Sequence, residues 1–453
     1  MTTERRAVPI LTISALLFAI LAAASSNHVR KIDHVIVVSV DGMKPESYTE
    51  PDTHHLKVPT LRAIVNSGAY SDGVQSVMPT VTYPNHTAMV TGVNPLKHGI
   101  YTNPAWDPYD RNYGGYRWYT EDIKVPTIYQ IASQRGLKTA LIHWPVTVGA
   151  QADFNMPEVW RASIPEDLKL FRALSTPGSF EAVAKDFPDF TEAVSPPDQT
   201  DIAWADAACY AIAHLKPNLM FVHLAMVDHQ QHLHGPFSAE GNQAIETADA
   251  QIARIIEATK KAGTWNSTAL VVVSDHGFAP ISQLFRPGVM LREKGLVTLD
   301  AKGKITDWKA TLITDGGSAY IYLKDPNDEA TRSAVLAMFT LSTEGIRRIA
   351  RHDDIVKMGG DPNALIALEA ADGAVLASGY AGDAHSAIPP AGTHGYFPDR
   401  PEMRASMLFY SPPLAHGKIE NAHIIDLAPT IARWLNLPLP NADGVPLAIT
   451  PNK

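Results

Sequence analysis

The chain has 453 residues, of which 45% are hydrophobic and 19% charged, a composition typical of a folded protein with a large core and not of a disordered one. Its formal charge of −9 and the lack of a basic stripe in the sequence argue against binding to a nucleic acid polymer, whereas a small phosphorylated substrate held by metal is compatible with both. Cys209 is the only cysteine, so no internal disulfide is expected.

Residues 1–24 have the pattern of a secretory signal peptide. Two arginines precede an apolar run over residues 7–24, and the run ends in three alanines that provide a small-residue cleavage site. An uncleaved membrane anchor is the alternative, because the run is nearly long enough to span a bilayer. We therefore expect a secreted or periplasmic mature chain over residues 25–453, associated with a membrane only if the N-terminal segment is retained.

Strand-like apolar runs alternate with helix-like segments along most of the mature chain. Continuous apolar runs, typical of strands buried on both faces, occupy residues 35–40, 139–143, 219–227 and 269–274. Helical segments, each followed closely by a glycine, are expected at residues 60–66, 127–135 and 244–261. This alternation predicts an α/β fold with a mainly parallel central sheet and helices on both faces.

Two stretches depart from this alternation. Residues 101–122 are rich in Tyr, Asp, Asn and Gly, which indicates a long surface loop near the site. Residues 301–390 mix short strand-like runs, such as 319–323, with turns and one helix around 329–339. Because the strongest α/β signals lie on both sides of the second stretch, we interpret it as a cap or insert within a single catalytic domain.

Metal-type side chains follow three of the predicted strands. They are Asp41, Asp228, Asp275 and His276. Because ligands in open α/β sheets gather at the carboxyl ends of the strands, these side chains are expected to lie together. A single aspartate after a strand is more often a helix cap or a turn former, but four such residues at three strand ends are harder to explain in that way.

Two histidines extend this set. His232 follows Asp228 by four residues, so a helical turn would place both on one face, and His394 stands in a glycine-flanked loop after the insert. Three carboxylates and three imidazoles suit zinc better than calcium or magnesium. Six ligands are too many for one tetrahedral zinc, but three for each of two zinc ions leave each ion an open position. A pair of metals favours displacement at phosphorus or at a carbonyl.

The stretch "TVTYPNHTAM", residues 80–89, carries the candidate nucleophile. Pro84 suits the first position of a helix, so Thr82 is expected just before the helix N-terminus, where backbone amides and the helix dipole favour anions. Coordination to zinc would lower the pKa of the Thr82 hydroxyl and produce an alkoxide without a separate base. The alternative is a threonine that only caps the helix.

Together these residues resemble the nucleotide pyrophosphatase/phosphodiesterase family of the alkaline phosphatase superfamily, over roughly residues 33–280 and 390–435. The family's T-[FY]-P-N-H stretch reads here Thr82-Tyr83-Pro84-Asn85-His86. The resemblance implies an alkaline-phosphatase-like sandwich and two zinc ions per chain. By this similarity one zinc is held by Asp41, Thr82, Asp275 and His276, and the other by Asp228, His232 and His394.

The resemblance also implies how the substrate is held. An asparagine after an H-G-I stretch, here Asn103, would bind a phosphoryl oxygen together with the backbone amide of Tyr83. The implied reaction is in-line attack of Thr82 on phosphorus, followed by hydrolysis of a phosphothreonine by a zinc-bound water. The family commonly has a nucleobase-stacking tyrosine five residues before the aspartate of its D-x-x-x-H motif. Here that position is His223, a departure that puts base stacking in question and leaves His223 as a substrate-binding candidate.

The sequence therefore favours a zinc-dependent hydrolase of phosphodiester or pyrophosphate bonds. Nucleotide-type substrates are favoured, and lysophospholipids and cell-wall diesters stay open as alternatives because the loops at residues 101–122 and 301–390 would set the choice. No basic residue follows Thr82 before Lys97, whereas a monoester presents an extra anionic oxygen that typically needs an arginine or a third metal. A distant arginine such as Arg111 would restore the alternative, a phosphomonoesterase or phosphonate hydrolase. A sulfatase is disfavoured because Cys209 is not followed by the C-x-P-x-R run. An inactive metal-binding scaffold would be expected to lack a ligand or the nucleophile, and none is missing.

Overall fold

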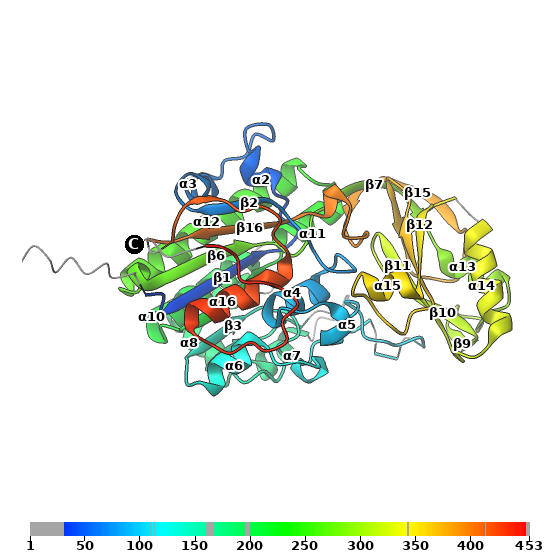
Figure 1. The fold of residues 1–453 in the computed structure, drawn as a ribbon, viewed down its shortest axis with the longest axis horizontal. Helices are drawn as coiled ribbons and strands as arrows, with labels where there is room; N and C mark the ends of the chain where they lie inside the picture. The colour runs from blue at the N-terminus through cyan, green and yellow to red at the C-terminus, as the bar shows by residue number, and fades with distance from the viewer. Residues whose placement is uncertain are drawn as a thin grey trace, which may run out of the picture.

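The computed structural model describes residues 31–449, except residues 110, 113, 160–166, 195–199, 342–343 and 413. The expected signal segment lies outside the described residues. Within the described part, no helix combines the length and the apolar character needed to cross a bilayer. The chain forms a large lobe built on one sheet and a smaller lobe beside it, joined by two long strands (Figure 1).

The large lobe contains an eight-stranded sheet in the order β17-β2-β16-β6-β1-β5-β3-β4. Its parallel part comprises β1 (His34–Val40), β3 (Thr139–Ile142), β4 (Phe154–Met156), β5 (Leu219–Leu224) and β6 (Thr268–Val273). At the other edge, β16 (Ala405–Tyr410) runs antiparallel to β6 and to β2 (Ala69–Val74), and β17 (Gly417–Lys418) closes the edge. The mainly parallel sheet is confirmed, but the strand expected over 219–227 ends at Leu224 because a helix begins at Met226.

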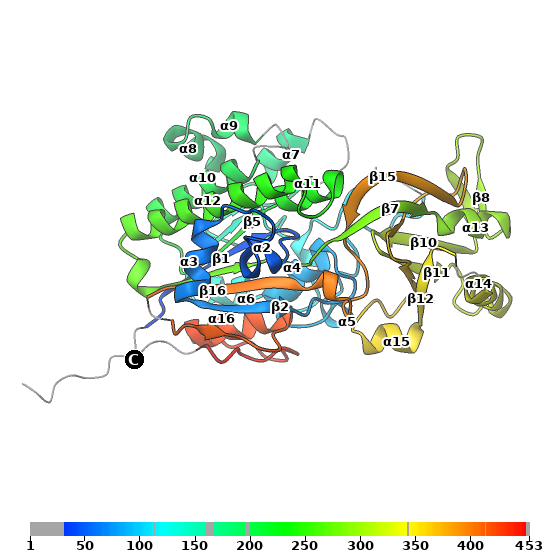
Figure 2. The same ribbon diagram turned by 90° about the horizontal axis from the view of Figure 1, so that it is seen from above.

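Successive side chains of β1 enter opposite layers, as the two-residue period of a strand requires. Ile36, Val38 and Val40 pack in one core with α3 (Pro59–Ser67), α10 (Thr200–His214) and α12 (Ala239–Lys261). Val35 and Val37 pack in the other with α4 (Thr82–Thr91), α6 (Ile128–Gln134) and α16 (Leu427–Leu435). Helices thus cover both faces, as predicted (Figure 2).

The remaining elements of the large lobe are short. They are α2 (Glu46–Thr49), α5 (Pro95–His98), α7 (Asp167–Leu174), α8 (Ser179–Asp186), α9 (Phe190–Ala193) and α11 (Met226–His234), with 3-10 turns at Thr120–Asp122, Trp265–Ser267, Pro401–Met403 and Ile424–Asp426. The three expected helices are present as α3, α6 and α12. Helix α12 starts five residues earlier than expected, because the Ser238 side chain accepts a hydrogen bond from Gly241 N and caps it.

The smaller lobe holds the expected insert. The chain leaves the large lobe through β7 (Ala279–Phe285) and returns through β15 (His385–Thr393), which pair with each other, while β14 (Ala374–Leu376) pairs with β7 (Figure 1). Its main sheet has the order β10-β11-β13-β12, formed by Ala310–Asp315, Ser318–Leu323, Ile366–Ala370 and Ile346–Arg351. The other elements are β8 (Val297–Leu299), β9 (Ile305–Trp308), α13 (Pro287–Glu293), α14 (Glu329–Leu341) and α15 (His352–Lys357). A separate apolar core fills this lobe, which begins before the expected boundary at residue 301.

The helix that carries the candidate nucleophile begins earlier than expected. Helix α4 starts at Thr82, with Val81 as its N-cap, so Pro84 is the third helical residue and not the first. Proline is still tolerated there, because the first four N–H groups of a helix have no partner within the helix. The expectation that Thr82 precedes the helix is therefore wrong, because the helix begins two residues before Pro84 and Thr82 is its first residue.

Candidate active site

The order of the central strands brings the predicted ligands together. Strand β1 lies between β5 and β6 and is parallel to both, so the carboxyl ends of all three open at one edge of the sheet. Asp41 follows β1 directly, and its backbone N–H donates to Leu224 O of β5 at 2.9 Å. Asp275 and His276 follow β6 within three residues, and Asp228 stands in the first turn of α11 after β5. The sequence-based expectation of a shared edge is met.

The ligands form two adjoining groups. In the first, His276 Nε2 lies 3.3 Å from Asp41 Oδ1 and 3.1 Å from Asp275 Oδ2. In the second, Asp228 Oδ1 lies 3.4 Å from His232 Nε2 and 3.4 Å from His394 Nε2. The rings of His276 and His394 stack at 3.7 Å between centroids, which places the two groups side by side. All six predicted carboxylate and imidazole ligands therefore converge.

The backbone fixes the orientation of all three imidazoles. Each ring directs Nδ1 at a carbonyl oxygen: His232 at Gly392 O (3.1 Å), His276 at Gly277 O (3.1 Å) and His394 at Thr80 O (3.0 Å). A carbonyl only accepts hydrogen bonds, so Nδ1 carries the proton and Nε2 keeps its lone pair. Each Nε2 faces a carboxylate of the set, and this arrangement is the one expected of metal-binding histidines.

Four buried atoms of the set have no hydrogen-bond partner. They are Asp41 Oδ1, Asp228 Oδ1, Asp275 Oδ2 and His276 Nε2. Burial, with the charge of Asp228, raises the pKa of Asp41 to about 7, and burial, with the charge of Asp41, raises that of Asp275 well above its usual value. Burial also keeps the pKa of His276 well below its usual value. Unpartnered atoms of this kind cost about 1–3 kcal/mol each, more if charged, unless a cation satisfies them.

These atoms fit zinc. Two ligands that each lie about 2.0–2.1 Å from a tetrahedral zinc are about 3.3 Å apart, and the four N···O separations of the site are between 3.1 and 3.4 Å. A mixture of imidazole nitrogens and carboxylate oxygens also suits zinc better than magnesium or calcium. The residues therefore fit the expected metal in donor type, spacing and unmet bonding capacity.

His86 connects Thr82 to the first group of candidate ligands. Thr82 is 7% exposed at the start of α4, and its carbonyl is 2.8 Å from Nδ1 of His86, one turn later. The same nitrogen lies 3.6 Å from Asp275 Oδ2, while His86 Nε2 bonds Ser39 Oγ at 2.9 Å. His86 stands in the motif of residues 82–86, but no role was predicted for it. It now links the start of α4 to Asp275.

Asn103 lies against the start of α4, as the resemblance implies. Its Oδ1 accepts the Tyr83 backbone N–H at 2.8 Å, so its Nδ2 faces away from that bond and is available as a donor. Asn103 and the Tyr83 amide were expected to bind a phosphoryl oxygen together. In the structure the Tyr83 amide instead donates to Asn103. The Tyr83 side chain is fully buried, and its ring meets that of Tyr116 edge to face at 5.3 Å.

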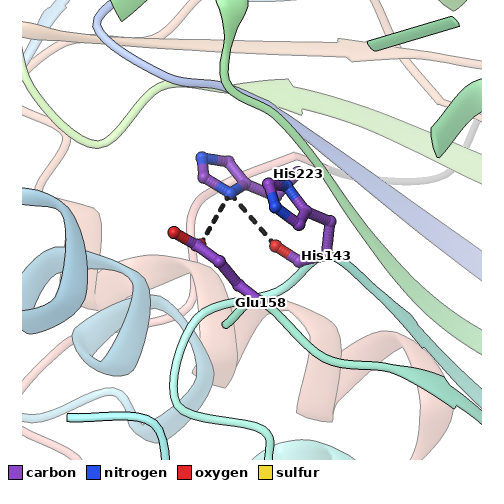
Figure 3. Close-up of side chains that lie close together, drawn as sticks. All are labelled: His143, Glu158 and His223. Atoms are coloured by element: carbon purple, nitrogen blue, oxygen red, sulfur yellow. Dashed lines mark hydrogen bonds and ion pairs between the residues drawn. The ribbon is translucent and has the colours of Figure 1, made fainter. Parts of the chain in front are cut away.

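His223 lies in a different environment from the one expected. It is 1% exposed, and its Nε2 lies 3.0 Å from Asp41 Oδ2. Its Nδ1 lies 3.2 Å from Glu158 Oε2 and 3.1 Å from His143 O (Figure 3). Both ring nitrogens thus contact protein atoms, and the contact to Asp41 makes His223 a neighbour of a candidate metal ligand. An imidazole enclosed in this way has no free edge for a substrate. The contacts of His223 therefore do not support its predicted role in substrate binding.

For two residues near the site, no pattern in the sequence predicted a role. Glu158 follows β4 in a stretch without a motif, and only the fold brings it to His223. Arg111, the example of a distant arginine that would favour a monoesterase, packs over the Tyr109 ring at 5.0 Å. Arg117 is the second residue, and its backbone N donates to Asn103 O at 3.0 Å.

The sequence matches the type I phosphodiesterase / nucleotide pyrophosphatase family over residues 35–397. It is 23% identical over 253 residues to ectonucleotide pyrophosphatase/phosphodiesterase family member 1 of Mus musculus, covering 53% of this chain and 24% of that protein. It is 25% identical over 256 residues to the venom phosphodiesterase of Naja atra, covering 55% of this chain and 26% of that protein. The chain thus spans about a quarter of the length of these relatives.

Solved structures show the same fold. Murine ectonucleotide pyrophosphatase / phosphodiesterase 5 superimposes with a TM-score of 0.61 at 21% sequence identity, covering 91% of this chain and 97% of that one. The alkaline-phosphatase-like architecture expected from the motifs is therefore confirmed. The family match covers most of the chain and includes all the candidate ligands. The chain belongs to the type I phosphodiesterase / nucleotide pyrophosphatase family, a family of phosphoric ester hydrolases.

Proposed function

We propose that this chain is an exported, zinc-dependent hydrolase that cleaves phosphodiester or pyrophosphate bonds, with nucleotide-type substrates favoured, through a phosphothreonine intermediate. The observation that carries the proposal is the convergence of unpartnered carboxylate oxygens on three imidazoles whose Nε2 lone pairs face them. The names of the similar proteins, an ectoenzyme and a venom enzyme, support export together with the N-terminal segment.

The proposed zinc sites divide the ligands as the motifs imply. Asp41, Thr82, Asp275 and His276 would hold one ion, and Asp228, His232 and His394 the other. When bound, the two ions supply positive charge at the attacking and the leaving oxygen of a displacement at phosphorus.

The residues of the chain position the reacting groups. Thr82 stands at the first position of α4, where the helix dipole favours an anionic substrate. Its Oγ forms the new bond to phosphorus as the bond to the leaving oxygen breaks, and water then releases the phosphoryl group from Thr82. Asn103, held by its Oδ1, directs its Nδ2 donors at a phosphoryl oxygen and stabilises the charge that develops there.

The test compares kcat/KM of the zinc-loaded mature protein on bis-p-nitrophenyl phosphate and on p-nitrophenyl phosphate. The proposal predicts a preference for the diester. A preference for the monoester would contradict it and would favour the phosphomonoesterase alternative. Turnover of neither ester by a zinc-loaded protein would favour the inactive scaffold.

A further inference from the structure

A cavity of about 760 Å³ lies between the 101–122 loop and the smaller lobe. Tyr101 and Arg117 line it from the loop, and Trp308 and Tyr322 from the smaller lobe. The cavity adjoins the candidate active site, since Arg117 N donates to Asn103 O and Asn103 is the residue assigned to the phosphoryl group. None of the metal ligands lines it, so it is a separate space beside the site.

Three aromatic rings form one wall of this cavity. The Trp106 ring is 4.6 Å from that of Tyr322 and 6.0 Å from that of Trp308, with interplanar angles of 67° and 74°. Trp106 is 42% exposed, which is unusual for so large an apolar side chain. Rings that meet edge to face leave ring surface on which a planar ligand can stack.

Two residues that line the cavity each have a hydrogen-bond donor without an acceptor. Arg117 Nε and Trp308 Nε1 are buried without a hydrogen-bond partner, and the Arg117 guanidinium forms no ion pair with a carboxylate of the described residues. Lys324 adds a second cation, although it pairs with Asp307 at 2.6 Å. Unmet donors and positive charge favour an anionic ligand rich in oxygen acceptors.

The one acidic residue among the described cavity residues is bonded to the cavity wall and not to Arg117. Asp361 accepts the Tyr322 hydroxyl at 2.8 Å through Oδ2 and the Asn363 N–H at 2.8 Å through Oδ1. Its two oxygens are therefore occupied by the cavity wall and form no ion pair with Arg117. The charge of Arg117 also acts on the carboxyl of Asp315, whose pKa is raised to about 8 by burial.

The smaller lobe reaches the site on the side of the second metal group. Gly317 N, in the turn between β10 and β11, donates to His394 O at 2.7 Å, and Asp315 Oδ2 accepts the Asn103 N–H at 3.3 Å. Strand β11 continues from this turn to Tyr322 in the cavity wall. The proposed attacking residue, Thr82, belongs to the first group, so an ion held by the second group would stabilise the leaving oxygen. The cavity therefore lies on the leaving-group side.

We propose that this cavity binds the leaving-group half of the substrate when that half carries a planar ring and an anionic phosphate, as a nucleotide does. The ring stacks at Trp106 and the phosphate accepts hydrogen bonds from Arg117. This inference rests on the proposed phosphodiesterase function. It adds a selectivity for extended nucleotide leaving groups over small ones.

The test uses two substrates that transfer the same AMP group and differ only in the leaving group. In the p-nitrophenyl ester of AMP the leaving group is small, and in diadenosine tetraphosphate it is ATP. We expect Arg117→Gln and Trp106→Ala each to lower the ratio of kcat/KM for the tetraphosphate to kcat/KM for the ester by about tenfold or more. The matched controls are Arg111→Gln and Tyr119→Ala, an arginine and a 46% exposed aromatic of the same loop that lie outside the cavity, and they should leave the ratio unchanged.

An unchanged ratio of the two kcat/KM values in the Arg117 and Trp106 variants would overturn the inference. This holds even if both variants lose activity on both substrates, because an equal loss on the two substrates means that Asn103 was disturbed. If the wild type cleaves neither substrate, the proposed function fails, and calorimetry still decides the cavity. ATP should then bind the zinc-loaded wild type about tenfold more tightly than the Arg117→Gln variant, and equal dissociation constants would overturn the inference.

Discussion

The Nε2 atom of His223 lies 3.0 Å from Oδ2 of Asp41, and the opposite ring nitrogen lies 3.2 Å from Oε2 of Glu158 (Figure 3). Burial alone lowers the pKa of His223, but the hydrogen bonds and charges of Asp41 and Glu158 raise it well above its usual value, so both nitrogens carry protons. The imidazolium therefore holds one oxygen of Asp41 and leaves the other, Oδ1, to face His276.

Glu158→Gln is expected to weaken zinc binding at the first group. The substitution keeps the volume of the side chain but removes the charge that orients His223, and through it Asp41. Loss of such an outer contact typically lowers metal affinity about 10–100-fold. Competition with a zinc chelator measures the effect. His214→Gln, which breaks an exposed pair with Asp186, is the control, and a Glu158→Gln affinity equal to the control would refute the orienting role.

Thr82→Ala and Asp275→Asn should separate chemistry from metal binding. Thr82→Ala removes the nucleophile but leaves the six carboxylate and imidazole ligands in place, so we expect turnover to vanish while zinc content is largely kept. Asp275→Asn removes a buried charge that faces His276, so zinc content should fall as well. Metal analysis beside single-turnover kinetics distinguishes the two. If the Thr82→Ala variant retains turnover, Thr82 is not the nucleophile and the alternative of a helix-capping threonine is favoured.

Removal of zinc should destabilise the protein, and more so at high pH. Asp41, Asp228 and Asp275 have raised pKa values in the metal-free fold, to about 7 for Asp41, chiefly through burial. An acid whose folded pKa lies above its unfolded value of about 3.9 binds more protons when folded, so its contribution to stability falls as pH rises through that range. We therefore expect a chelator to lower Tm more at pH 8 than at pH 6. Thermal scans with and without chelator provide the check, and an equal drop at both values would contradict the argument.

The sequence allowed the ligand set to be predicted because its signals are local. Asp41, Asp228 and Asp275 each follow an apolar strand within a few residues, and parallel strands place their carboxyl ends at one edge whatever their order. The contacts that orient the ligands depend instead on the order of β1, β3 and β5, which no single segment encodes. Glu158 could not be assigned for that reason. His223 was assigned to substrate binding by its position in a motif, but its direction is set by packing against residues distant in the sequence.

The smaller lobe also was only partly predictable. Its strands at Ser318–Leu323 and its helix at Glu329–Leu341 follow from local pattern, and both were expected within one or two residues. Its contact with the site was not, because the hydrogen bond from Asn103 N to Asp315 joins segments 212 residues apart. Such a contact depends on the folded path of the chain, in which β15 leads back to the large lobe and places His394 beside β10.

That return depends on Gly395, which leads to the last prediction. Gly395 has φ +85°, and a Cβ there would lie 1.9 Å from Asp315 O, a separation that no side chain tolerates. Gly395→Ala should therefore push the loop away from β10 and displace the neighbouring His394, lowering zinc occupancy at the second group as well as Tm.

Gly373→Ala is the matched control. Gly373 also has a positive φ, of +74°, but a Cβ there meets nothing within 4 Å, so only the backbone strain of about 1–2 kcal/mol applies. Zinc titration and thermal unfolding of both variants separate strain from collision. If Gly395→Ala loses no more zinc than Gly373→Ala, the close approach of Asp315 does not position His394, and the smaller lobe contributes to the metal site in some other way.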